Sequence, residues 1–139
     1  MTTSLTVKQS IISTVSALPA VAGYQVTWSL QQNQPKQWIM VGKIDYSSGV
    51  WKTNRQYEEN YSIDVVINCI LPGGTALAVE SEVLRVHAAI AAALTPDPTF
   101  AGVAVTSLPA IQRVVSWPTP DGFEGQCDST VSVTARQAR

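Results

Sequence analysis

Charged residues are scarce in this sequence of 139 residues. Asp, Glu, Lys and Arg together make up 14% of it, whereas soluble proteins average about 25%. We therefore expect part of the surface to face other protein rather than water, through self-association or docking. The formal net charge of −1 provides no global field that would attract nucleic acid.

Histidine and cysteine are also rare, which removes most motifs for metal binding and nucleophilic catalysis. No HxxxH, CxxC or GxSxG pattern is present, and a metal site needs several clustered ligands. The single histidine, His87, is expected to be a packed or surface residue of a helix. A disulfide between Cys69 and Cys127 is geometrically possible, but two buried free thiols in a reducing compartment are the expectation.

Signals for export and membrane insertion are missing as well. The N-terminal residues contain no basic segment followed by an apolar block, so we expect no signal peptide. No apolar run reaches the roughly 18 residues that span a bilayer. The length suits one domain, residues 1–139, which can bury a core without disulfides or metal. We expect a soluble protein made in a cytoplasm, with no membrane partner.

Apolar residues at helical spacing predict two amphipathic helices. The first spans about residues 6–18, with Thr6 as its cap and Pro19 ending it. The second follows a cap at Thr75 and runs to about Leu94. The predicted buried stripes are Val7, Ile11, Ile12, Val15 and Leu18 in the first helix, and Val79, Val83, Val86, Ile90 and Leu94 in the second.

Alternating residues predict the strands. Residues 24–30 and 37–46 are joined by a short polar segment, which favours an antiparallel hairpin. Residues 60–71 alternate most clearly, with Tyr61, Ile63, Val65, Ile67, Cys69 and Leu71 on the core side.

The C-terminal part supplies the remaining strands. The stiff corner at Pro96–Pro98 returns the chain from the second helix to the sheet. Residues 102–117 form one long or interrupted strand, in which Pro109 implies an edge position or a bulge. Residues 118–126 are predicted to be a loop, and residues 128–136 the last strand. This order indicates an α+β fold: a mixed, mostly antiparallel sheet with two helices packed on one face.

Residues of about 46–60 are the least regular part and are predicted to form a protruding arm. Aromatic residues beside cations are typical of protein interfaces. The alternative is that the arm folds back on its own sheet and buries these aromatics. The candidate residues for a subunit or tube interface are Tyr46, Trp51, Lys52, Arg55 and Tyr57.

Two possible chemical sites are weighed against their structural alternatives. The acidic group Asp45, Glu58, Glu59 and Asp64 would be needed for a metal-dependent hydrolase, but no ligand spacing supports it, and a solvated acidic edge is favoured. The segment LPGGT at residues 71–75 has neither the lysine nor the glycine spacing of a phosphate-binding loop. We expect no catalytic residue, metal or cofactor.

The order of elements and four phrases resemble the tail terminator (tail completion) proteins of long-tailed bacteriophages, the lambda terminator group. The phrases are SALPAVAGYQV at 16–26, NYSIDVVINCI at 60–70, ALTPDPTFAGV at 93–103 and STVSVTAR at 129–136. The resemblance covers about residues 5–136.

The resemblance implies a structural virion protein of the tail or neck, made in the cytoplasm of a bacterial host. Such proteins form a hexameric ring on the head-proximal end of the tail tube. The ring stops tube polymerisation and offers a surface to head-completion or connector proteins, while DNA only passes through the lumen. A different neck component, such as a connector or stopper, and a cellular α+β interaction module are the alternatives.

Overall fold

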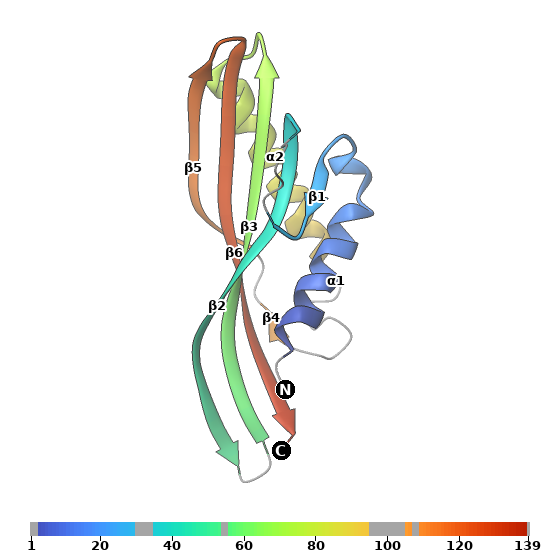
Figure 1. Cartoon of the computed structure of the whole chain (residues 1–139), viewed down its shortest axis with the longest axis vertical. Coiled ribbons are helices and arrows are strands. Elements are labelled where there is room, and N and C mark those ends of the chain that lie inside the picture. The colour runs from blue at the N-terminus through green and yellow to red at the C-terminus, as the bar shows by residue number, and fades with distance from the viewer. Residues whose placement is uncertain (1–2, 30–34, 54–55, 95–104, 107–108, 139) are drawn as a thin grey trace.

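The computed structural model describes residues 3–29, 35–53, 56–94, 105–106 and 109–138, and for 48–53, 56–58, 105–106 and 136–138 the backbone alone. The order is α1 (Ser4–Ser16), a 3-10 turn η1 (Pro19–Val21), β1 (Gln25–Thr27), β2 (Gln37–Thr53), β3 (Gln56–Pro72), α2 (Ala76–Leu94), β4 (Val105–Thr106), β5 (Ala110–Thr119) and β6 (Gly122–Ala138) (Figure 1).

One sheet contains all six described strands. The long strands β2, β3 and β6 form its centre, in the order β1-β2-β3-β6, and both β4 and β5 pair with the outer side of β6. β3 and β6 pair antiparallel without a register shift from Gln56↔Ala138 to Pro72↔Gly122. The sheet twists strongly, so the three long strands cross in projection (Figure 1).

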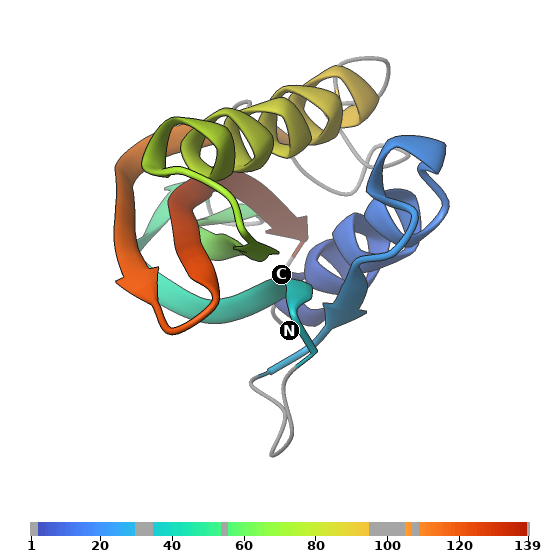
Figure 2. The same cartoon turned by 90° about the horizontal axis from the view of Figure 1, so that it is seen from above.

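Both helices cover one face of this sheet, as the sequence predicts. α2 contacts β3, β5 and β6, whereas α1 contacts β1, β2 and α2; Figure 2 shows α2 across the top of the curved strands and α1 at their right side. The core between them is apolar because alternate strand residues point toward the helices. Its fully buried side chains include Ile11, Ile39, Ile63, Ile67, Val83 and Ile90.

Several sequence predictions are confirmed by burial. The predicted stripe of α2 is buried throughout, and so are the odd-numbered residues of β3 from Tyr61 to Cys69. Thr75 caps α2, since its Oγ1 accepts a hydrogen bond from the Ala78 N–H at 3.1 Å. Both cysteines are free and buried, and burial raises the pKa of Cys127 to about 11.

The predicted antiparallel hairpin of residues 24–46 is wrong, because β1 pairs with β2 in parallel, with Gln25 opposite Trp38. A parallel pair requires the chain to return to the start of the first strand. Here the return is short: β1 has three residues, a length of about 10 Å. The segment between Thr27 and Gln37 therefore contains enough residues to span this distance.

The predicted loop at 118–126 is also wrong. β5 continues to Thr119 and β6 begins at Gly122, so the connection is a tight hairpin. Pro118 is tolerated in β5 because that strand lies at the sheet edge and pairs only with β6 in the described chain. The hairpin packs on the turn after β3: a Cβ at Gly122 would lie 2.3 Å from the Leu71 carbonyl oxygen.

Two further expectations need adjustment. α1 begins at Ser4, so Thr6 lies inside the helix and the N-cap is Thr3. Residues 102–117 contain two separate strands, β4 and β5, on the same edge of β6, and the edge position expected for Pro109 agrees with this arrangement. The corner at Pro96–Pro98 lies outside the described residues.

Candidate functional site

The segment expected to form the arm is built from the far ends of three strands. β2 and β3 remain paired to Thr53↔Gln56, and β6 runs beside them to Ala138. Figure 1 shows β2, β3 and β6 continuing past both helices toward the end of the molecule where the C-terminus lies. This three-stranded extension has no helix over it in the described chain.

The candidate interface residues fall on this extension. Trp51 in β2 stands opposite Tyr57 in β3, next to Lys52, which places the two aromatic residues at one register position; Arg55 lies outside the described residues. Register shifts occur between Tyr46 and Ser48 and again between Trp51 and Thr53. Such bulges bend a strand and increase its twist.

Tyr46 is the candidate whose side chain is described, and it stands at the base of the extension. It is 55% exposed. The centroid of its ring lies 5.6 Å from that of its cross-strand partner Tyr61, with an interplanar angle of 53°. Its hydroxyl hydrogen-bonds to Ser4 Oγ. One side of the Tyr46 ring therefore packs against Tyr61, and the other side is exposed to solvent.

Glu59 and Tyr61 of β3 hold the start of α1 at the same place. The carboxylate of Glu59 accepts a hydrogen bond from the Thr3 N–H at 3.0 Å, and Thr3 Oγ1 lies 2.9 Å from the Tyr61 hydroxyl. Glu59 is 7% exposed and Tyr61 2%. Partial burial raises the pKa of Tyr61. A shallow pocket of about 300 Å³ beside Tyr46 and Tyr61 is lined mainly by hydroxyl groups and Asp45.

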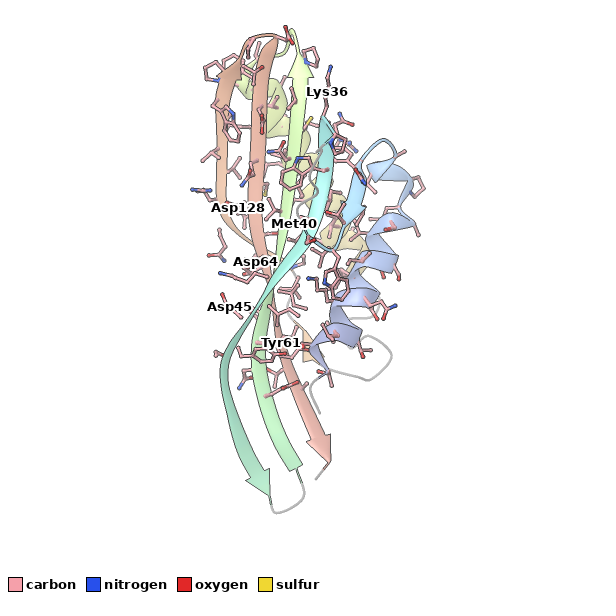
Figure 3. The ribbon with its side chains drawn as sticks, viewed as in Figure 1. Lys36, Met40, Asp45, Tyr61, Asp64 and Asp128 are labelled. Carbon is pink, nitrogen blue, oxygen red and sulfur yellow. The ribbon has the colours of Figure 1, made fainter. Side chains whose placement is uncertain are left out.

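The face of the sheet away from the helices carries a row of paired charges. Lys43 Nζ lies 3.0 Å from Asp45 and 4.0 Å from Asp64, and Arg113 lies 3.0 Å from Asp128. Figure 3 shows Asp45, Asp64 and Asp128 following one another along this face, on the side away from α1.

Asp64 lies on this open face and has a raised pKa. Partial burial raises its pKa, and the nearby Asp45 and Asp128 carboxylates raise it further, against the lowering effect of Lys43. A hollow of about 290 Å³ lies beside Asp64 and Asp128. The arrangement is a set of three surface carboxylates beside two cations, in which Asp45 and Asp64 share Lys43.

The acidic group considered for a metal site is divided by the sheet. Asp45 and Asp64 lie on the open face, whereas Glu59 points to the helix face and binds Thr3; the side chain of Glu58 is outside the description. Among the described residues, no group of three or more His, Cys, Asp or Glu could hold a metal ion. His87 is buried, and burial lowers its pKa.

The contacts of Thr3, Glu59 and Tyr61 were not predicted. They join residues 56 and 58 positions apart, and neither end has a local motif that would reveal the partner. The one sequence signal is that the first turn of α1 contains no acidic residue, because the first N–H groups of a helix need acceptors from side chains, water or other elements.

Comparison with known proteins gives a match in three-dimensional fold and none in sequence. No family model and no curated protein sequence matches the chain. Among solved structures, its fold is similar to that of a chain described as "Virion of native gene transfer agent (GTA) particle". The TM-score is 0.61 at 12% identity, and the alignment covers 94% of this chain and 94% of that chain. In the described part, no helix is long and apolar enough to cross a membrane.

Proposed function

We propose that this protein is a structural component of a phage-like particle and serves as its tail terminator. In this role it forms a hexameric ring on the head-proximal end of the tail tube, stops tube polymerisation and offers a surface to head-completion or connector proteins. The observation that carries the proposal is the fold shared over nearly the whole length of both chains with a chain of a gene transfer agent virion.

A ring requires a heterologous interface between neighbouring copies of the chain. When one surface of a subunit meets a different surface of the next, the contacts either close into a ring or continue as a filament. A ring of the tube's symmetry covers the growing end, and growth stops because the opposite side of the ring does not resemble a tube subunit.

The extension of β2, β3 and β6 provides the subunit or tube contact in this proposal. Tyr46 exposes 55% of its surface at the base of the extension, and Trp51, Lys52, Arg55 and Tyr57 belong to the same segment. Aromatic residues with arginine are the typical anchors of interfaces. They bridge neighbouring subunits or the ring and the tube.

The open face is suited to DNA that passes without being held. Its basic residues Lys43 and Arg113 are each paired with carboxylates, so few cations are available to phosphates. Binding to the DNA backbone depends on such cations. With a net charge of −1, the protein would line a channel without gripping its contents.

The proposal is tested by negative-stain imaging of the purified protein, alone and mixed with tail tubes, together with sizing at physiological salt. We expect hexameric rings, either in solution or at one end of each tube. A monomer that leaves both tube ends bare would contradict the proposal. Rings that bind a purified connector and ignore tubes would instead identify another neck component.

Replacing Trp51 with alanine tests the role of the extension. We expect ring formation to need roughly tenfold more protein, as for an aromatic anchor, with the thermal midpoint of the monomer nearly unchanged. Trp28→Ala is the matched control, because Trp28 lies outside the extension, where its ring centroid is 4.1 Å from Lys8 Nζ. This variant should leave assembly intact. If Trp51→Ala unfolds the monomer, the indole packs in the core of its own subunit and not at an interface.

A further inference from the structure

The helix α1 starts without a cap of its own. Its N-cap residue, Thr3, makes no side-chain capping bond, and the first turn contains no acidic residue. The first N–H groups of a helix need acceptors, and its N-terminus favours negative charge. Glu59 of β3 supplies both, because its carboxylate accepts the Thr3 N–H at 3.0 Å and lies 3.4 Å from Thr3 Oγ1.

Two tyrosines hold the same turn from the same strands. The hydroxyl of Tyr61 lies 2.9 Å from Thr3 Oγ1, and that of Tyr46 bonds to Ser4 Oγ. Ser4 is 1% exposed and Tyr46 is 55% exposed, so these contacts lie where the core meets the surface. Tyr46 and Tyr61 are cross-strand partners with their rings in contact. Three strand side chains therefore hold the N-cap residue Thr3 and the first helical residue Ser4.

The position of these contacts is informative. They lie beside the register shift between Tyr46 and Ser48, where β2 bends. Past this point none of the described helices covers the strands (Figure 1), and in Figure 3 Tyr61 lies near the start of α1. The bend sets the direction of the extension, and α1 is attached at the bend.

We infer that the first turn of α1 is a strap that fixes the direction in which the extension of β2, β3 and β6 projects, with Glu59, Tyr46 and Tyr61 as positioning residues. The consequence for assembly rests on the proposed function, in which the extension meets a neighbouring subunit or the tube. A released extension samples many directions, so a ring must order it on closing and forms less readily.

Two variants cut the strap in different ways. Glu59→Ala removes the acceptor of the Thr3 N–H. The double variant Tyr46→Phe with Tyr61→Phe keeps both rings and removes only the two hydroxyls, so it remains informative if the buried Glu59 position does not tolerate alanine. Tyr24→Phe is the matched control, because it removes a tyrosine hydrogen bond to Glu82 of 3.0 Å at another place in the fold.

Hydrogen exchange of backbone amides in residues 47–58 tests the strap in the monomer. We expect about tenfold faster exchange in both strap variants, as for the loss of a hydrogen bond to a charged group or of two neutral ones. Exchange in these residues should be unchanged in Tyr24→Phe. Unchanged exchange in the strap variants, or equal acceleration in the control, would overturn the strap.

Ring assembly tests the consequence and separates the two proposals. The strap variants should form several-fold fewer rings than wild type at equal concentration, with Tyr24→Phe as wild type. If exchange accelerates and rings form normally, the strap does not position the extension for assembly. If wild type forms no ring alone or on tubes, the proposed function fails, and the exchange result still decides the strap.

Discussion

The two faces of β3 differ in what they contact, although their residues alternate along one strand. Ile63, Val65 and Ile67 point to the helices and are at most 1% exposed. Asp64 and Asn68, on the other face, make polar contacts with side chains of β2 and β6. The helix face buries apolar groups, whereas the open face carries polar ones: Asp64 remains partly in water, and the amide of Asn68, which is 1% exposed, donates to Glu124 and Gln126.

The two faces of β3 therefore contribute differently to the stability of the fold. Burial of aliphatic groups is the main stabilising contribution in a domain of this size, so the helix face determines whether the chain folds. Exposed ion pairs contribute little, so the open face can be changed with small effects on folding. The extension is a third region of the sheet, because none of the described helices covers it.

The largest effect is expected from Ile67→Ala. Ile67 is fully buried on the helix face, and its truncation should lower the free energy of unfolding by about 2–5 kcal/mol. Val66→Ala, one residue away on the open face, is the control and should cost about 1 kcal/mol or less. Urea denaturation measures both, and equal losses would show that the two faces do not differ in packing.

Gly125→Ala should have an intermediate effect. Gly125 pairs with Cys69 across the strands, and a Cβ on it would lie 3.0 Å from two side-chain carbons of Val79 in α2. The helix must shift to accept it, at a cost of about 1–3 kcal/mol. The same denaturation measurement applies, and an unchanged midpoint would mean that α2 does not pack closely against the sheet there.

The smallest effect is expected on the open face, from Asp64→Asn. Because the folded pKa of Asp64 is raised above its ordinary 3.8, the ionised carboxylate is disfavoured in the folded state, and wild type loses stability as the pH rises through the raised value. The variant avoids this loss. It should match wild type below about pH 4 and exceed it by less than about 1 kcal/mol at pH 7.

The pH dependence of unfolding, followed from pH 3 to 8, checks this prediction. A variant that is less stable than wild type at pH 7 would mean that the attraction of Lys43 outweighs partial burial and the neighbouring carboxylates. The control Asp121→Asn changes an exposed carboxyl group in the turn between β5 and β6 and, as a surface substitution, should change the free energy of unfolding at pH 7 by no more than about 0.5 kcal/mol.

The parts of the fold that local periodicity determines could be predicted from sequence. The stripe of α2 and the alternation of β3 are repeated over many residues, so single exceptions do not hide them. The direction of β1 could not be predicted, because three residues contain no information about which way their partner runs. The sequence predicts a loop at the hairpin of Pro120–Asp121 because prolines usually end strands, and the edge position of β5 is what permits Pro118.

The candidate site was predictable in part. The segment 46–60 stood out by composition, and Tyr46 is indeed partly exposed. The contact between Thr3 and Glu59 joins residues 56 positions apart, and only the folded chain brings them together. Whether the extension meets a second copy or the tube is a property of an assembly, so a single chain leaves it as a prediction.

Tube growth in the presence of the protein tests the central claim most directly. Purified tail-tube subunits are allowed to polymerise with increasing amounts of wild-type protein, and tube lengths are measured by electron microscopy. The account predicts that growth stops at amounts far below one protein per tube subunit, with one ring on each stopped end. Tubes that reach the same length at every ratio would contradict it.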